Sequence, residues 1–252
     1  MTIPWALLVE MPQDSAEEPA WLGRAERRIL ANLCVPKRRA DWLLGRYAAK
    51  SVVARLLGDT HRIDVPLESI DIVAEASGAP AVRLGAAGAP AVGVTISHSG
   101  GRAFSAAWTE GAGGISVGVD LEEISTRSSA LVHDFFCSEE IDAWKSLLPG
   151  GPRDTFATAV WSAKEAVSKA LRVGLAVDTR SVGILLAEKE AAISHGLPRP
   201  YGGFWKSFEA LVGPEVPGGG RALAGFWREQ EGFVLTMAVA GPASGERGRR
   251  AA

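Results

Sequence analysis

Apolar and polar residues alternate along the chain with two different periods, and these periods predict its secondary structure. The clearest helical stripe has apolar residues at every fourth position, at Leu44, Ala48, Val52 and Leu56. This spacing marks one face of an α-helix, for which Pro36 suits the first turn and Gly58 the end. Further helical patterns cover residues 14–33, with Asp14 and Ser15 at the start, residues 128–148 and residues 153–172.

Short apolar runs bounded by Gly, Ala and Pro predict strands between these helices. They cover residues 69–75, 80–84, 91–97 and 103–109 in the first part of the chain, and residues 115–122, 181–187, 204–212, 222–228 and 233–240 in the second. Strands and helices are mixed without a regular βαβ alternation, so the order favours an α+β fold.

The segment GAGG at 111–114 predicts a junction between two halves, because glycine-rich stretches punctuate folded segments. The first half then comprises residues 1–112 and the second half residues 113–241. The last residues, 242–252, read PASGERGRRAA and are predicted to form a disordered tail.

Composition narrows the class of protein. The 252 residues are 47% hydrophobic and 22% charged, which is typical of a soluble globular protein. The formal net charge of -2 gives no strong field, so neither nucleic acid nor a membrane is an expected partner. Cys34 and Cys137 lack metal-ligand spacing, which argues against a zinc site or a disulfide framework. The chain starts without a signal-peptide pattern and has no membrane-length apolar run, so we expect a cytoplasmic protein.

The segment GVDLEEIS, at 118–125, places carboxylates at the end of an otherwise apolar strand. Alternate residues of a strand point to the same face, so Asp120 and Glu122 project together and Leu121 projects oppositely. Two carboxylates on one face repel each other unless a cation or proton lies between them, and oxygen ligands suit Mg²⁺. The alternative is a strand that simply ends in a solvated turn.

The segment WSAKEAVSKAL, at 161–171, places three large residues one helical turn apart: Trp161, Glu165 and Lys169. A surface ion pair between Glu165 and Lys169 is the simpler interpretation. However, the tryptophan on the same stripe indicates a partly covered face, where both charges need partners. Glu165 is then a candidate third metal ligand, and Lys169 a candidate partner for a phosphate.

The segment ISHSGG, at 96–101, offers Ser97 and His98 as hydrogen-bond donors beside flexible glycines. Such donors can hold a phosphate, although a loop with a hydrogen-bonded histidine is the simpler explanation of this segment taken alone. A basic helix face with Arg39, Arg46 and Lys50 is either solvated or an anion-binding surface. The chain contains no G-x-S-x-G, Walker A or G-x-G-x-x-G motif, so the matching hydrolase and nucleotide-binding sites lack support.

These three segments follow one another along the chain as ISHSGG, GVDLEEIS and WSAKEAVSKAL. In this order they resemble the 4′-phosphopantetheinyl transferase superfamily, and the chain length best fits its larger, two-half, surfactin-synthetase-activating type. Three further segments extend the resemblance over most of residues 25–240: PKRRADWLLGRYAAKSVV, FFCSEEIDAW and LTMAVAGP. The resemblance implies two similar α/β halves related by a pseudo-twofold axis, with the active site in the cleft between them. It also implies a monomer, because one chain supplies both halves.

The family transfers the 4′-phosphopantetheine arm of coenzyme A to a serine of an apo acyl or peptidyl carrier protein, releasing adenosine 3′,5′-bisphosphate. For this chain the resemblance implies a metal site, a coenzyme A site and a catalytic base. Mg²⁺ is held by Asp120, Glu122 and Glu165. Coenzyme A is contacted by Lys169 and Lys164 at the pyrophosphate, by Ser97 and His98 at the 3′-phosphate, and by the basic helix that carries Arg39 and Arg46. Glu165 acts as the base and Glu140 assists it, while the two-half type points to polyketide or nonribosomal peptide synthesis.

One departure from the family concerns the coenzyme site. Many members have a lysine in a YGKP-like turn, whereas this chain has SGAP at 77–80. Ala79 cannot supply the missing charge, and Arg83 is a neighbouring candidate to replace it. Phe135, Phe136 and Trp144 are candidates either for a carrier-binding surface or for the core. Two alternative functions stay open: a protein that binds coenzyme A or a carrier without turnover, and a metal-dependent phosphodiesterase.

Overall fold

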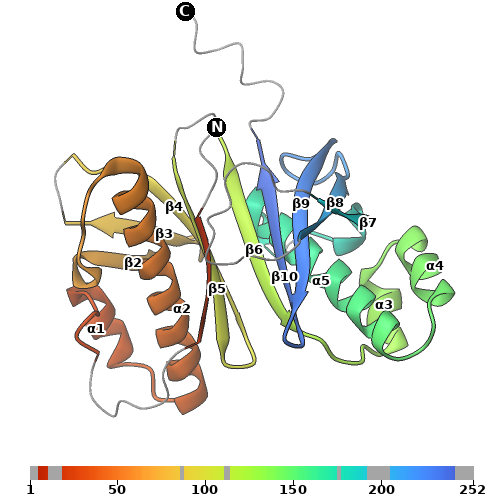
Figure 1. Ribbon diagram of the computed structural model, residues 1–252, viewed down its shortest axis with the longest axis horizontal. Coiled ribbons are helices and arrows are strands. Elements are labelled where there is room, and N and C mark those ends of the chain that lie inside the picture. Colours follow the sequence, from red (N-terminus) through yellow and green to blue (C-terminus); the bar gives the residue numbers. More distant parts are fainter. Residues whose placement is uncertain are drawn as a thin grey trace, which may run out of the picture. The chain divides into compact units, whose positions relative to one another are not determined.

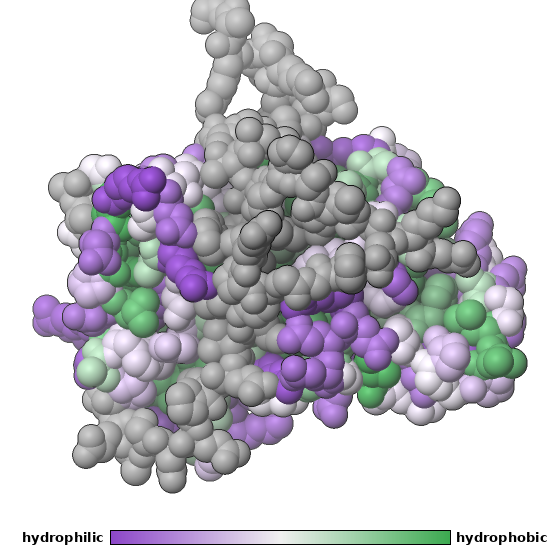
Figure 2. Space-filling view, in the orientation of Figure 1, coloured by the Kyte–Doolittle hydropathy of each residue, from purple (hydrophilic) through white to green (hydrophobic). Residues whose placement is uncertain are grey.

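The computed structural model describes residues 5–10, 19–85, 88–110, 114–174, 177–191 and 205–241. These residues divide into two compact units, 5–110 and 114–241 (Figure 1). Cys34 and Cys137 are free thiols. None of the described helices is long and apolar enough to cross a membrane. Hydrophilic and hydrophobic residues are interspersed on the surface of both units in the view of Figure 2.

The first unit is an antiparallel sheet with a long helix packed on it. Its elements are β1 (Trp5–Glu10), α1 (Arg24–Leu30), α2 (Pro36–Leu56), β2 (Ile70–Ala74), β3 (Pro80–Leu84), β4 (Val92–Ser99) and β5 (Arg102–Thr109). The strand order is β1-β5-β4-β3-β2, and all neighbours are antiparallel. The predicted stripe on α2 is buried at Leu44, Ala48, Val52 and Leu56, which explains why this helix lies on the sheet.

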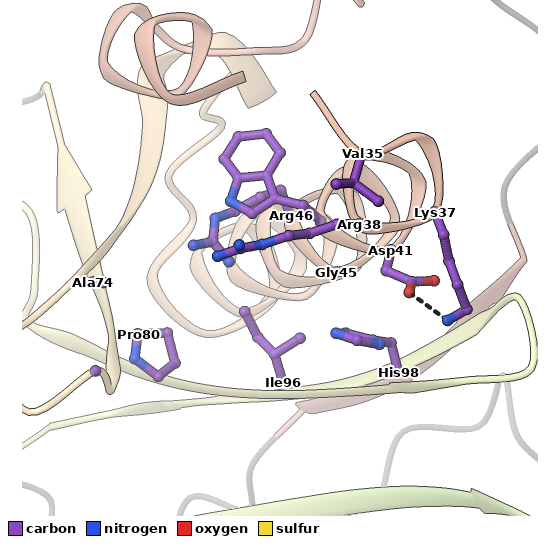
Figure 3. Close-up of a pocket in the computed structure, with 12 residues that line it drawn as sticks. Val35, Lys37, Arg38, Asp41, Gly45, Arg46, Ala74, Pro80, Ile96 and His98 are labelled. Atoms are coloured by element: carbon purple, nitrogen blue, oxygen red, sulfur yellow. Dashed lines mark hydrogen bonds and ion pairs between the residues drawn. The ribbon is translucent and has the colours of Figure 1, made fainter. Parts of the chain in front are cut away.

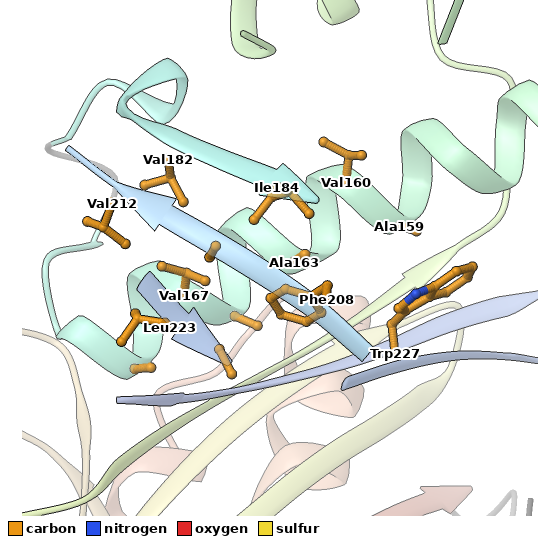
Figure 4. Close-up of a cluster of buried hydrophobic side chains, with 14 of the residues drawn as sticks. Ala159, Val160, Ala163, Val167, Val182, Ile184, Phe208, Val212, Leu223 and Trp227 are labelled. Carbon is orange, nitrogen blue, oxygen red and sulfur yellow. The ribbon is translucent and has the colours of Figure 1, made fainter. Parts of the chain in front are cut away.

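The second unit has the same kind of architecture. Its elements are β6 (Ser116–Glu123), α3 (Ser129–Phe135), α4 (Ser138–Ser146), α5 (Gly151–Leu171), β7 (Val182–Ala191), β8 (Trp205–Val212), β9 (Arg221–Gln230) and β10 (Phe233–Ala240). The strand order is β6-β10-β9-β8-β7, again antiparallel. Helix α5 packs on this sheet through Val160, Ala163 and Val167, which meet Ile184 and Phe208 in the core (Figure 4).

The order of elements is the same in both units. Each begins with a strand, continues through helices and ends with four antiparallel strands, of which the last pairs with the first strand of the unit. The predicted mixture of helices and sheets is therefore confirmed. The shared order supports two similar halves, whereas the pseudo-twofold axis between them stays a prediction.

At the N-terminal end one prediction was wrong and one strand was missed. The helix predicted over residues 14–33 is the shorter α1, and residues 19–23 before it are not helical. Gly23 forms the N-cap, and its N–H donates to the Glu26 side chain, so the helix starts where that carboxylate satisfies a terminal backbone donor. Strand β1 was not predicted. The predicted junction glycines at 111–113 and the predicted tail at 242–252 lie outside the described residues.

Candidate functional site

A pocket in the second unit is lined by several carboxylates and two aromatic rings. We call it the carboxylate pocket; its volume is about 560 Å³, and its lining residues are Asp120, Glu122, Asp134, Phe135, Trp161, Glu165, Val177, Asp178 and Thr179. Phe135 and Trp161 contact each other edge to face, with ring centroids 5.3 Å apart. The pocket therefore combines acidic groups with an apolar wall.

Strand β6 brings the first two carboxylates to this pocket by simple alternation. Leu121 is buried, while Asp120 and Glu122 on either side of it share the opposite face. Asp120 lies opposite Thr236 in the register with β10. The hydroxyl of Thr236 lies 2.8 Å from that of Ser162, which ties α5 to the same region of the sheet.

Helix α5 supplies the third carboxylate because it packs unusually closely on β6. A Cβ atom on Gly118 would lie only 1.9 Å from the carbonyl oxygen of Ala166, so the strand and helix backbones nearly touch. Only glycine leaves room for this approach. Glu165 precedes Ala166, and it lines the pocket with Asp120 as a consequence of this contact.

Two cations partner the carboxylates. The Lys169 ammonium donates to Asp120 Oδ1 at 2.7 Å, and the Arg127 guanidinium donates to Glu122 Oε2 at 2.9 Å. Burial raises the pKa of the Glu165 carboxyl; Lys169 works in the opposite direction, and Asp120 and Glu122 raise it further. Glu165 thus lies within the electrostatic reach of both other carboxylates.

The donor set of the carboxylate pocket fits a hard divalent cation. Its carboxylates offer oxygen atoms alone, which is the chemistry that Mg²⁺ prefers. As the side chains lie, no group of three or more His, Cys, Asp or Glu residues in the described ranges is arranged to hold a metal ion. Binding would require Asp120 and Glu122 to share or release Lys169 and Arg127.

Glu140 and Lys164 are not part of this pocket, contrary to the sequence-based expectation. Their ion pair is 2.9 Å long, and both side chains are 1% exposed. Lys164 also donates to the carbonyls of Thr179 and Val182. Because its ammonium is surrounded by these acceptors, Lys164 is not placed to contact a pyrophosphate. Glu140 accepts from two backbone N–H groups and is not placed to assist a base.

A second pocket lies in the first unit, between α2 and the strands β2, β3 and β4 (Figure 3). We call it the basic pocket; its volume is about 580 Å³, and its lining residues are Val35, Lys37, Arg38, Asp41, Trp42, Gly45, Arg46, Ala74, Gly78, Pro80, Ile96 and His98. Lys37 is paired with Asp41 at 3.0 Å. Arg38, Arg46 and His98 add further nitrogen donors, so the pocket suits an anion.

Arg46 is the most buried cation of the basic pocket. Its guanidinium stacks on the Trp42 ring, with Cζ 5.0 Å from the centroid, and its Nε atom is buried without a hydrogen-bond partner. Burial lowers the pKa of this guanidinium, while Glu26 works in the opposite direction. A buried donor with no partner inside the protein favours binding of an acceptor from outside.

The structure brings together only part of the predicted coenzyme site. His98 lines the basic pocket, whereas Ser97, which precedes it in β4, is buried and points to the other face. Arg39 donates to the carbonyl of Leu30 and does not line the pocket. Lys50, on the predicted basic face, is fully buried beside Glu26.

The structure also places the remaining candidate residues of both units. Gly78 and Pro80, which flank Ala79, line the basic pocket, whereas the exposed Arg83 does not. Sequence reasoning missed Arg38 and Trp42, although positions 38, 42, 45 and 46 share one helix face and therefore carried a usable signal. Phe135 lines the carboxylate pocket, while Phe136 is buried and Trp144 packs against the core.

A comparison with known protein families matches the segment that forms the carboxylate pocket. The family model of the 4′-phosphopantetheinyl transferase superfamily matches residues 116–225. This segment contains β6, α5 and all the residues that line the pocket. No curated protein matches the chain.

Two solved structures are partly similar. One is the holo-[acyl-carrier-protein] synthase of Thermotoga maritima, at 15% identity and a TM-score of 0.31, covering 49% of this chain and 61% of that one. The other is a complex of ACPS with CoA from Chronobacterium ammoniagenes, at 21% identity and a TM-score of 0.33, covering 41% of this chain and 93% of that one. This chain thus spans about three fifths of the first synthase. The family match confirms the resemblance seen in the sequence for the second unit: residues 116–225 match the 4′-phosphopantetheinyl transferase superfamily.

Proposed function

We propose that this chain transfers the 4′-phosphopantetheine arm of coenzyme A to a serine of an apo acyl or peptidyl carrier protein, with Mg²⁺ as its metal. The observation that carries the proposal is the carboxylate pocket, which Asp120 and Glu122 line from β6 and Glu165 lines from α5, inside the segment that matches the family. A cluster of oxygen donors is what a magnesium–pyrophosphate substrate requires.

The residues of the carboxylate pocket have different proposed roles. Asp120, Glu122 and Glu165 would hold Mg²⁺, which when bound neutralises the pyrophosphate and stabilises the charge that develops on the leaving group. Lys169 lies beside Asp120 at 2.7 Å and is 30% exposed, so its ammonium can turn toward a phosphate. Arg127, which pairs with Glu122, is the other cation at this pocket.

Glu165 is the candidate base of the reaction. The carrier serine loses its proton as its oxygen forms a bond to the phosphorus nearer pantetheine, and the bond from that phosphorus to the bridging oxygen of the pyrophosphate breaks. Adenosine 3′,5′-bisphosphate leaves with that oxygen. Burial raises the pKa of Glu165 in the metal-free protein.

The basic pocket of the first unit is the candidate site for the 3′-phosphate of coenzyme A. Arg46 and His98 line it from α2 and β4, and Arg38 adds a third nitrogen-bearing side chain. Arg46 holds a buried, unpartnered Nε atom, which a phosphate oxygen can satisfy.

We expect Arg46→Met to raise the KM for coenzyme A about tenfold with kcat little changed, since a charged hydrogen bond to phosphate contributes roughly 1.5–3 kcal/mol. Steady-state kinetics with coenzyme A as the varied substrate measure this. Arg55→Met, on an exposed position of the same helix, is the matched control and is expected to leave KM unchanged. An unaltered KM in Arg46→Met would remove the basic pocket from the coenzyme site.

Intact-protein mass spectrometry tests the proposed function directly. An apo peptidyl carrier and an apo acyl carrier are each incubated with the protein and coenzyme A, with and without Mg²⁺. We expect a phosphopantetheine mass gain that requires both protein and metal. Tight binding of coenzyme A with no gain on any carrier would instead favour a binding protein, and cleavage of a phosphodiester without a carrier would favour a phosphodiesterase.

The proposal has two finer parts. The two-half type points to carriers of polyketide or nonribosomal peptide synthesis, so we expect the peptidyl carrier to be the better acceptor. It also points to a monomer, which sedimentation in solution would show. A strict preference for the acyl carrier would contradict the first part, and a stable dimer would contradict the second.

A further inference from the structure

The first unit contains a buried ion pair that joins three of its elements. Glu26, in the first turn of α1, accepts hydrogen bonds from the N–H of Gly23 at 3.0 Å and from the N–H of Ile72 on β2 at 3.0 Å. Its carboxylate also pairs with the ammonium of Lys50 on α2, and neither side chain is exposed. One carboxylate therefore links the short helix, the long helix and strand β2.

The second unit contains the same arrangement. Glu140, in the first turn of α4, accepts from the N–H of Cys137 at 2.9 Å and from the N–H of Ile184 on β7 at 2.7 Å. It pairs with the ammonium of Lys164 on α5 at 2.9 Å, and both side chains are buried. In each unit the strand N–H belongs to the third residue of its strand.

The correspondence extends along the sequence. Glu26 and Glu140 are 114 positions apart (140 − 26), and so are Lys50 and Lys164 (164 − 50). The same offset relates two aromatic pairs in contact, Trp21 with Tyr47 and Phe135 with Trp161, whose ring centroids are 5.4 and 5.3 Å apart. Four residues of each unit thus repeat in both their spacing and their contacts. A longer repeat is not visible in the sequence.

The carboxylate and ammonium groups of the carboxylate pocket do not repeat in the first unit. The offset of 114 places Ser51 at the position of Glu165 (165 − 114) and Arg55 at that of Lys169 (169 − 114). The buried pair therefore occurs in the first unit without the carboxylates that line the pocket of the second. What the two units share is that the long helix bearing the lysine also lines a pocket.

We propose that each buried lysine–glutamate pair is a positioning element. It fixes the long helix that lines its own unit's pocket, both in its rotation about the helix axis and in its position along that axis. Lys164 directly precedes Glu165 and lies three residues after Trp161, while Lys50 lies one turn after Arg46. A helix held at a buried ammonium cannot rotate without leaving a charge unpaired, which is costly. The Glu140–Lys164 pair thus orients Glu165, and the Glu26–Lys50 pair orients Arg46.

The kinetic part of the inference rests on the proposed function and uses two matched double variants. Glu140→Gln/Lys164→Met and Glu26→Gln/Lys50→Met each remove both charges, and the glutamine oxygen can still accept from one of the two backbone N–H groups that the carboxylate bound. Because neither variant leaves an unpaired buried charge, both are expected to fold. We expect the first double variant to lower kcat about tenfold and to leave the KM for coenzyme A within roughly twofold. We expect the second to raise this KM about tenfold and to leave kcat within roughly twofold.

Amide hydrogen exchange on the same variants tests the positioning without any enzyme assay. We expect faster exchange confined to α5 and β7 in the first double variant, and to α2 and β2 in the second. If the unaltered protein modifies no carrier, the proposed function fails, while this exchange pattern still supports the positioning role. Unchanged exchange in both helices would overturn the inference, as would a fall in kcat of the first variant that disappears once the rate is divided by the folded fraction, which leaves KM unaffected.

Discussion

Asp120→Asn and Glu165→Gln are each expected to lower the rate of carrier modification about a hundredfold or more, while the protein stays folded. Both substitutions keep the shape of the side chain and remove one oxygen charge from the carboxylate pocket. A metal that polarises a phosphoryl group contributes several kcal/mol to the transition state, and each 1.36 kcal/mol corresponds to about tenfold in rate. Time courses of carrier modification by intact mass, at increasing Mg²⁺, measure the loss.

The matched control is Glu123→Gln. Glu123 follows Glu122 on β6 but is exposed and does not line the pocket, so the substitution removes the same charge from the other face of the strand. Its activity is expected to equal that of the unaltered protein. Full activity in Asp120→Asn or Glu165→Gln would contradict the assignment of the metal ligands, and equal loss in all three would indicate a non-specific effect of net charge.

Much of the fold follows from periodicity alone. The stripe from Leu44 to Leu56 predicted the face that α2 buries, and Pro36 predicted where the helix begins. The helix ends at Leu56, and the predicted stop, Gly58, lies in the π-helical turn that follows. The nine strands predicted from alternation or apolar runs all occur. Strand β1 was missed because its sequence, WALLVE, has no alternation, and an apolar run of this length does not distinguish a strand from a helix.

The carboxylate pocket was predictable in part because its residues obey two simple periods. The period of two on β6 puts Asp120 and Glu122 on one face, and the period near four on α5 puts Trp161 and Glu165 on another. No period reveals that these two faces meet. That depends on the close approach at Gly118, which is a three-dimensional property of the strand and helix backbones.

Glu140 and Lys164 show where sequence reasoning had to fail. A lysine in the segment SAKEA is equally compatible with a phosphate contact, a surface position and a buried pair. Its burial is decided by Glu140, which is 24 positions away and lies on another helix. The same separation of 24 relates Glu26 and Lys50. The repeated pair was therefore visible in the sequence only once the contacts identified which residues to compare.

Gly118→Ala is expected to destabilise the second unit by about 3 kcal/mol, the upper end of the cost of overpacking a core. The new methyl group would lie 1.9 Å from the Ala166 carbonyl oxygen and 2.4 Å from the Ala170 nitrogen. Both are backbone atoms of α5, so no side-chain rotation relieves the clash, and the helix must move away from β6. The midpoint temperature of thermal unfolding is expected to fall by roughly 10 °C for a unit of this size.

The same substitution distinguishes packing from chemistry, because it adds a methyl group without touching a carboxylate. Movement of α5 carries Glu165 away from Asp120, so transfer activity per folded molecule is expected to fall about tenfold or more, as small misplacements of reacting groups do. Gly151→Ala is the control: Gly151 lies at the start of the same helix, and a Cβ there meets nothing within 4 Å. It is expected to match or slightly exceed the stability of the unaltered protein. If Gly118→Ala kept both stability and activity, the close contact between β6 and α5 would not be what assembles the carboxylate pocket.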